Sequence, residues 1–336
     1  MTNHDLIGHW TRRFLLEHLV GECNYSHNTQ LNYRDTLVLL CPFVAKNVNK
    51  DIDQLCIDHF SPEVVRSFLI YLESARSCST ATRNQRLAAI HAWARFIGGK
   101  CPERIGWCTQ ICAIPFKKTS RPLRTYLDKP EIQAILNAPD RNTSNGFRHH
   151  ALLLFLYNTG ARASEAAHLR IGDLQLNRSP SVKIMGKGAK ERLCPLWLST
   201  VEIMNRLVMG RDPASRVFLN FRGQPMTRFG VHIIVGKHAL KAANQMPVLR
   251  TKNISPHTIR HTTAVHLLCA GVDLNTIRAW LGHVSLDTTN IYAEVNLEMK
   301  AKALARCETP LVSTPGEDWS QDQKLMTFLK SIGSTI

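Results

Sequence analysis

The sequence predicts a two-domain protein that is mainly α-helical, with one small β-hairpin in its second domain. Its 336 residues exceed what a single ordinary core contains. Apolar residues recur at helical spacing through most of the first 98 residues, and a basic segment without periodicity follows at 117–129. Farther on, two short β-type stretches flank a glycine-containing turn. We therefore expect domains at 1–116 and 130–336, joined by a linker at 117–129.

The first domain should consist of helices around a single core. Apolar stripes predict helices at 11–20, 29–44, 62–72 and 80–97. Ser61 is a suitable N-cap and Pro62 a suitable first residue for the third of these helices. Gly98 and Gly99 are expected to end the fourth helix.

The second domain should combine helices with the hairpin, which is an α+β arrangement. Asp128 can cap a helix with Pro130 in its first turn, and Glu131 completes a capping box. The apolar run at 148–158 is typical of a buried helix. Strands are expected at 181–185 and 191–196, and further helices at 163–169, 199–209, 227–243, 256–269, 273–281 and 285–293. An amphipathic stretch follows at 325–332.

The charge balance predicts a polyanionic partner. Lys and Arg number 42 against 26 Asp and Glu, which gives a formal net charge of +16. Each phosphate that a basic protein neutralises releases counterions, so this excess suits nucleic acid. Ribosomal and membrane-surface proteins share the trait, and charge alone does not identify the polyanion.

The cysteines and the N-terminal residues favour a cytoplasmic protein with reduced thiols. The ten cysteines include no C-x-x-C pair, and Cys101, Cys108 and Cys112 lack partners at zinc spacing. No signal peptide begins the chain, and the longest apolar run, 151–157, is too short to span a bilayer. We expect no metal, no cofactor and no membrane association.

Two arginines have the chemistry to hold a phosphate. Arg162 stands in T-G-A-R-A-S-E at a predicted helix start, where free backbone N–H groups also favour an anion. Arg260 stands in S-P-H-T-I-R-H, three residues after His257 and on the same helix face. A guanidinium donates paired hydrogen bonds to phosphate and keeps its proton. Taken alone, Arg162 is better explained as a surface arginine beside Glu165.

Lysine and histidine could supply proton transfer. Lys187 lies in the glycine-flanked hairpin turn G-K-G, where other cations would lower its pKa and make it a better proton donor, with Lys190 as the alternative. His283 follows Gly282 in a turn between two helices, from which it can project into a cleft. A basic hairpin tip and a structural turn histidine are the ordinary interpretations of each residue alone.

Tyr292, in T-T-N-I-Y-A-E-V, is the candidate nucleophile. A phenol is mostly neutral at pH 7, with a reference pKa of about 10, so it needs activation. Nearby arginines favour the phenolate and a histidine can accept its proton. A lone tyrosine on an amphipathic helix is more often a core residue, and the prediction depends on the ordered set of cations before it.

In order and spacing, these six residues resemble the signature of the tyrosine recombinases, also called the phage integrase family. The matching segments are T-G-x-R-x-S-E, G-K-G-x-K-x-R, H-x-x-R-H, L-G-H and T-x-x-Y. The segments T-Q-L-N-Y-R-D-T-L and S-T-A-T-R-N-Q-R-L-A-A-I-H-A-W look like the helical, SAM-like core-binding domain of Xer-like members. Ala161 departs from the larger aliphatic residue usual there, which should affect packing only.

The resemblance implies a site-specific DNA recombinase or integrase, carried by a mobile element. In such proteins two domains clamp double-stranded DNA, and the tyrosine forms a 3′-phosphotyrosyl link without metal or ATP. It implies a homo-tetramer in the synaptic complex, a monomer or dimer off DNA, and accessory DNA-bending proteins. The stretch 325–332 would dock on a neighbouring protomer or pack on its own domain. The expected location is the cytoplasm, in association with the nucleoid.

Further basic residues are candidate DNA contacts, although each is equally typical of a solvated surface. They are Arg83, Arg86, Lys117, Lys118, Arg121, Arg124 and Lys190. Two other functions remain open at this point: type IB topoisomerase-like cleavage and resealing, and non-catalytic DNA-binding regulation on the same scaffold. The complete residue set argues against the regulator, which would need neither Lys187 nor Tyr292.

Overall fold

The computed structural model describes residues 6–119, 125–186, 190–282 and 323–332. The chain divides into two compact units, Met1–Pro122 and Leu123–Ile336. Within the described ranges the protein is mainly helical with one small antiparallel sheet, which confirms the predicted fold class. Each helix in these ranges is too short or too polar to cross a membrane.

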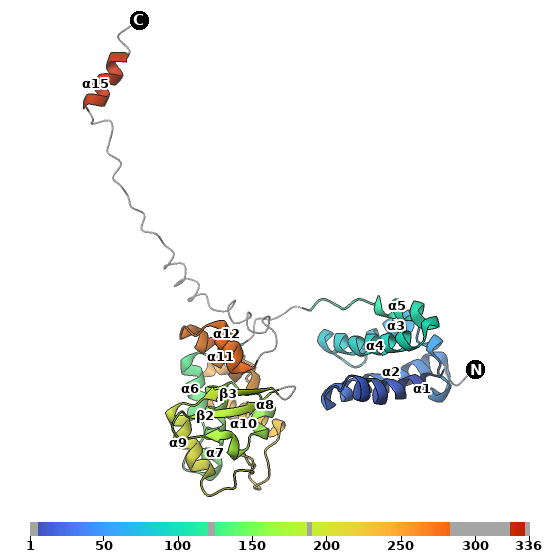
Figure 1. The fold of residues 1–336 in the computed structure, drawn as a ribbon, viewed down its shortest axis with the longest axis horizontal. Helices are drawn as coiled ribbons and strands as arrows, with labels where there is room; N and C mark the ends of the chain where they lie inside the picture. The colour runs from blue at the N-terminus through green and yellow to red at the C-terminus, as the bar shows by residue number, and fades with distance from the viewer. Residues whose placement is uncertain (1–5, 120–124, 187–189, 283–322, 333–336) are drawn as a thin grey trace. The chain divides into compact units, whose positions relative to one another are not determined.

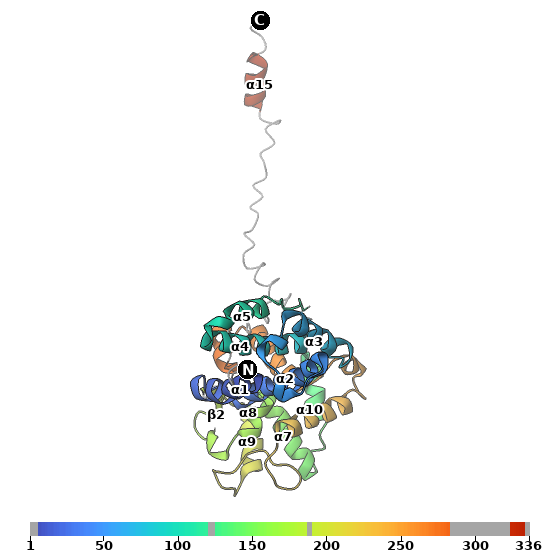
Figure 2. The same ribbon diagram turned by 90° about the vertical axis from the view of Figure 1, so that its right-hand side faces the viewer.

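The first unit is a helical bundle (Figures 1 and 2). Its α-helices are α1 (Ile7–Arg13), α2 (His27–Val48), α3 (Pro62–Ser74), α4 (Thr80–Lys100) and α5 (Ile105–Cys112). A π-helix, η1 (Phe14–Glu22), continues α1, and short 3₁₀ turns are η2 (Ile52–Gln54), η3 (Ile57–His59) and η4 (Pro102–Arg104). As predicted, the Ser61 hydroxyl caps α3 by accepting a hydrogen bond from the Val64 N–H.

Helix α4 forms the centre of this unit and packs against α2, α3 and α5. Its Trp93 is fully buried, with its ring edge-on to those of Phe60 and Trp107. The prediction that Gly98 and Gly99 end this helix is wrong, because α4 continues to Lys100. A Cβ at Gly98 would lie 2.8 Å from the Cβ of Cys108, so glycine is required here for the close approach of α5.

The second unit combines helices with one small sheet (Figure 1). Its α-helices are α6 (Lys129–Asn137), α7 (Ser144–Thr159), α8 (Ala163–His168), α9 (Leu198–Val208), α10 (Arg228–Ala242), α11 (Pro256–Cys269), α12 (Leu274–Leu281) and α15 (Gln323–Ile332). Two 3₁₀ turns are η5 (Ile171–Asp173) and η6 (Pro247–Thr251). The predicted helix at 285–293 lies outside the described residues.

The sheet has strand order β1-β2-β3, where β1 is Leu174–Gln175, β2 is Ser181–Met185 and β3 is Glu191–Pro195. Both predicted strands are present, and the short β1 adds an edge strand that the sequence pattern did not indicate. Val182 pairs with Cys194 and both are fully buried, whereas Lys183 on the other face is exposed. The sheet therefore packs one face on the core and leaves the other to solvent.

Helix α7 is buried along nearly its whole length and forms the centre of the second core. Helix α11 packs against α7 and α12, and α12 also contacts β3. Leu127, placed in the linker by the sequence, is fully buried in this core. Asp128 caps α6 in the predicted capping box, so residues 125–129 belong to the second unit because they complete its packing.

Candidate active site

Arg162 is held at the N-terminus of α8 by the turn that follows α7. Gly160 ends α7 with φ of 61°, a left-handed conformation that suits glycine. A Cβ at this position would lie 2.5 Å from Cδ2 of Leu281. Arg162 is then the N-cap residue of α8, and its side chain is 38% exposed. The Arg162 guanidinium thus stands at a helix start, as predicted, with part of its surface open to solvent.

His257 and Arg260 come from the first turn of α11. Pro256 opens the helix, and the Ser255 hydroxyl caps it by accepting a hydrogen bond from the Thr258 N–H. His257 is exposed, whereas Arg260 is 1% exposed. His261 is buried and its ring stacks edge-on against that of His257, with centroids 4.2 Å apart. His261 therefore supports the ring of His257.

Arg260 joins two distant segments of the chain. Its Nη1 donates to the Gly160 carbonyl at 2.7 Å, and its Nη2 donates to the Leu281 carbonyl at 2.5 Å. The guanidinium is consequently fixed at the junction of the α7–α8 turn with the end of α12. A guanidinium fixed in this way keeps its proton and its positive charge at this junction.

Glu165 organises these arginines, although sequence reasoning named it only as a neighbour of Arg162. Its carboxylate accepts from Arg162 Nη1 at 2.7 Å and from the Arg162 backbone N–H at 2.8 Å. Arg192 donates to both of its oxygens, at 3.2 and 2.6 Å, and Arg260 Nη1 lies 4.0 Å away. Burial opposes ionisation of Glu165. The hydrogen bond and charge of Arg192, followed by the donors of Arg162, outweigh burial and lower its pKa to about 2.

The guanidinium groups and the imidazole meet at one open cavity of about 330 Å³. It is lined by Arg162, Ala163, Ser164, Arg228, His232, Ser255, Pro256, His257 and Arg260. The structure thus brings together three of the six residues predicted from the sequence. It adds Arg228 and His232 from the N-terminal part of α10, which sequence reasoning missed because their helix start carries no distinguishing pattern.

The other three predicted catalytic residues, Lys187, His283 and Tyr292, lie outside the described residues. The structure does describe residues that flank them in the chain, namely Gly186, Lys190 and Gly282. The Gly186 N–H donates to the Lys190 carbonyl at 2.8 Å and closes the base of the β2–β3 turn. Gly282 ends α12 with φ of 65°, directly before position 283.

The predicted DNA contacts differ in their exposure and in their hydrogen-bond partners. Arg83 is 6% exposed and donates to the Pro115 carbonyl at 3.1 Å, so its guanidinium supports packing and we remove it from the DNA-contact set. Arg86 is half-buried, and its Nε and Nη1 have no hydrogen-bond partner within the described ranges. Lys117 pairs with Glu73 at 2.6 Å, and Lys118 and Lys190 are exposed. Arg121 and Arg124 lie outside the described residues.

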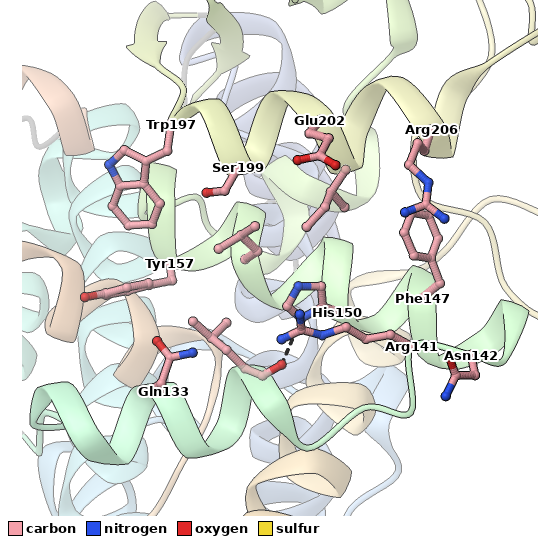
Figure 3. A pocket seen from close by; sticks show the side chains of 13 residues that line it. Gln133, Arg141, Asn142, Phe147, His150, Tyr157, Trp197, Ser199, Glu202 and Arg206 are labelled. Atoms are coloured by element: carbon pink, nitrogen blue, oxygen red, sulfur yellow. Dashed lines mark hydrogen bonds between the residues drawn. The ribbon is translucent and has the colours of Figure 1, made fainter.

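A second cavity of about 670 Å³ lies between α6, α7 and α9 (Figure 3). Gln133, Tyr157 and Arg206 line it, one from each helix, and His150 donates to the Leu136 carbonyl at 2.8 Å on its floor. Neither Arg162 nor the α11 residues of the first cavity border it. This cavity is therefore separate from the candidate active site.

The described residues contain no group of three or more His, Cys, Asp or Glu side chains that could hold a metal ion. The nine cysteines in the described ranges are free thiols. The site as described is a cluster of protein cations around a single buried carboxylate.

Comparisons with known proteins give the same picture. Residues 125–299 match the model of the phage integrase family, and residues 13–97 match that of the phage integrase N-terminal SAM-like domain. The y4rC protein of Sinorhizobium fredii is 35% identical over 334 residues, which cover 99% of this chain and 100% of that protein. Tyrosine recombinase XerC of Pelobacter propionicus is 32% identical over 302 residues, 87% of this chain and 94% of XerC.

Two solved structures share the fold. The Tn1549 transposon integrase in complex with a circular intermediate DNA has a TM-score of 0.66 at 18% identity, covering 88% of this chain and 98% of that chain. The XerH site-specific recombinase bound to palindromic difH has a TM-score of 0.63 at 21% identity, covering 85% and 82%. Both likenesses support a helical first domain followed by an α+β domain.

Proposed function

Because the chain belongs to the phage integrase family and is a tyrosine recombinase, we propose that it cuts and rejoins DNA strands through a covalent 3′-phosphotyrosyl link to Tyr292. The link stores the energy of the broken phosphodiester, so the reaction runs without ATP, and protein cations supply the charge stabilisation without a metal. The free 5′ hydroxyl of a partner strand then attacks the link and completes exchange.

The observation that carries this proposal is the convergence of Arg162, His257 and Arg260 on one cavity. A scissile phosphate develops negative charge on its non-bridging oxygens, and two fixed guanidinium groups match that charge in a geometry set before the substrate arrives. Glu165 supports this role because it holds Arg162 while leaving more than a third of that side chain exposed.

Residues around Arg162 and Arg260 would carry out the proton transfers. The exposed imidazole of His257 is suited to accept the phenol proton of Tyr292, and Lys187 to protonate the leaving 5′ oxygen. His283, placed directly after the end of α12, would add a donor to the phosphate. Because Gly186 and Lys190 close the hairpin base, Lys187 would stand at its tip.

We propose double-stranded DNA as the substrate and a mobile element as the source of the chain. The Tn1549 integrase structure is a complex with a circular intermediate DNA and the XerH structure is bound to a palindromic difH substrate, and this chain shares their fold at low identity. The first unit would be a core-binding domain at 1–116, followed by a linker that begins at 117 and a catalytic domain that includes residues 125–129. Arg86, Lys118 and Lys190 are the described side chains best placed to meet phosphates, with Arg121 and Arg124 as further contacts.

Assembly is proposed to follow the family pattern, with four protomers on two DNA sites, a monomer or dimer off DNA, and accessory DNA-bending proteins. Helix α15 presents Leu325, Phe328 and Leu329 to solvent, and an exposed apolar stripe of this kind suits docking on another surface. The neighbouring protomer and the helix's own domain are both candidate surfaces. The protein would act at the nucleoid, in the cytoplasm.

Tyr292→Phe tests the proposal directly. Target duplexes are first selected from a random library by binding, then nicked beside the cleavage position and incubated with protein. Denaturing electrophoresis should show a DNA-linked band for the wild type and none for Tyr292→Phe, while both bind the duplex with similar affinity. A DNA-linked band that persists in the variant would remove Tyr292 from its role. Relaxation of a supercoiled circle without strand exchange would favour topoisomerase activity.

A further inference from the structure

Arg192 lies in β3. Its guanidinium is buried, and each of its three nitrogens donates a hydrogen bond. Its side chain is 7% exposed. Nε donates to the Trp280 carbonyl at 2.9 Å, while Nη1 and Nη2 donate to the two oxygens of Glu165 at 3.2 and 2.6 Å. Arg192 thereby joins two segments of the chain, the first 27 residues away at Glu165 and the second 88 residues away at Trp280.

The first of these segments holds Arg162. Glu165 receives Arg192 on both oxygens and receives Arg162 through its side chain and its backbone N–H. With Arg192 in place, the carboxylate has one orientation, and the Arg162 guanidinium is fixed by it. Without Arg192, the buried Glu165 carboxylate would keep Arg162 as its close partner. The carboxylate would then be free to rotate towards Arg162.

The second segment ends at Gly282, directly before His283. A Cβ at Gly282 would lie 3.2 Å from both Cδ and Nη1 of Arg192, so the chain there runs against the guanidinium. The Cys194 thiol, two residues along β3, also donates to the Trp280 carbonyl, at 3.4 Å. The end of α12 is therefore tied to β3 at two points.

The hairpin before Lys187 passes the same side chain. A Cβ at Gly186 would lie 3.6 Å from Arg192 Nη1 and 3.8 Å from Oε1 of Glu165. Arg192 is thus in contact, or nearly so, with the chain that leads to Lys187, to His283 and to Arg162.

We propose that Arg192 is a positioning residue for strand cleavage, which sets Arg162 through Glu165 and fixes the chain that leads to Lys187 and His283. This inference rests on the proposed function. Lysine cannot take its place, because its three N–H donors sit on one nitrogen, which cannot occupy the separate positions of Arg192 Nε, Nη1 and Nη2. A misplacement of about 1 Å in a catalytic group costs roughly a hundredfold in rate, so small shifts here should be visible in the chemical step.

Three variants of the full chain test the role. Arg192→Lys keeps the charge, Arg192→Gln removes it, and Arg178→Lys is the matched control at an exposed loop position. For each variant we would measure the single-turnover rate of covalent linkage at saturating nicked duplex, the Kd for the same duplex, and the thermal unfolding midpoint. The rate is read at a temperature where every variant is folded.

We expect Arg192→Lys to lower the linkage rate by about a hundredfold, with Kd changed by less than about threefold. Arg178→Lys should match the wild type in all three measurements. A purely structural role predicts a different result for Arg192→Lys. The linkage rate would then follow the unfolding midpoint, and it would return to the wild-type value where the variant is folded. A rate within about threefold of the wild type would overturn the proposal.

Arg192→Gln adds a pH readout that separates positioning from packing. The charged and titratable groups facing Glu165 are Arg162 from the start of α8, Arg260 from α11, and Arg192 with the Cys194 thiol from β3. Loss of Arg192 should raise the pKa of Glu165, so linkage should fall as pH is lowered from about 7 to about 5. Combining Arg192→Gln with Glu165→Gln should abolish that added pH dependence.

The outcomes distinguish the two proposals. If the wild type forms the covalent link and Arg192→Lys keeps its rate, the positioning role fails while the recombinase chemistry stands. If the wild type forms no link with any selected duplex, the proposed function fails and the positioning role falls with it. An added pH dependence that persists in the double variant would also overturn the assignment to Glu165.

Discussion

Replacing Glu165 by glutamine removes the buried negative charge at the centre of the candidate site. The carboxylate is 4% exposed and accepts hydrogen bonds from Arg162 and Arg192, with Arg260 Nη1 4.0 Å away. Glutamine fills nearly the same volume, but it brings an NH₂ group that faces these donors. The expected result is a loss of stability that exceeds the cost of a lost surface ion pair.

The magnitude follows from the pKa of Glu165, which falls from 4.5 to about 2. At 1.36 kcal/mol per tenfold change in the ionisation constant, this fall corresponds to about 3 kcal/mol at neutral pH. The estimate agrees with the ~3–5 kcal/mol measured when one partner of a buried ion pair is removed. Because the folded pKa lies below the ordinary one, the stabilisation is complete above about pH 4.5 and is lost as pH falls towards about 2.

Differential scanning calorimetry of the full chain checks this prediction at pH 7. About 3 kcal/mol should lower the transition of the second unit by roughly 6–12 °C, at ~2–4 °C for each kcal/mol in a domain of this size. Glu202→Gln, at an exposed position on α9, is the control and should stay within about 0.5 kcal/mol of the wild type. A midpoint for Glu165→Gln within about 2 °C of the wild type would refute the reasoning.

Three further predictions concern the same unit. Arg162→Lys should lose at least about a hundredfold in single-turnover linkage rate, because lysine lacks paired donors, and retained cleavage would count against its role. Gly160→Ala should cost at least about 1 kcal/mol in thermal unfolding, from positive φ and the contact with Leu281, and an unchanged midpoint would contradict this. The half-buried His149 lies 2.9 Å from the buried His238. Burial and then the charge of His149 lower the pKa of His238 to about 4, so stability should fall as pH drops from about 6.5 to about 4. His238→Gln should flatten that pH dependence in urea titrations, and an unchanged slope would refute it.

The helix starts and the hairpin were predictable from sequence because local chemistry determines them. Ser61 and Asp128 each cap the helix that they were expected to cap, and α11 begins and ends at its predicted bounds, 256–269. Strand β2 was predicted at its observed bounds, since Val182 and Ile184 alternate with exposed residues. These signals act over a few residues and do not depend on the rest of the fold.

Features that depend on tertiary packing were not predictable in this way. Gly98 reads as a helix stop, yet it allows α5 to approach α4, and α5 itself has a weak apolar stripe. Arg83 resembles a DNA contact until its guanidinium is seen to be buried. The interaction of Arg192 with Glu165 joins residues 27 apart, and no spacing rule connects a strand arginine to a helix-cap glutamate. Of the candidate site, the residue types were predictable, and the network that orients them was not.

The bonds of Arg260 have a consequence for synthesis of the chain. They join the Gly160 carbonyl, 100 residues earlier, to the Leu281 carbonyl, 21 residues later. Contacts of such sequence separation form late, because loop closure must precede them. A nascent chain therefore lacks the complete set of bonds that fixes the Arg260 guanidinium until Leu281, the last residue of α12, has left the ribosome.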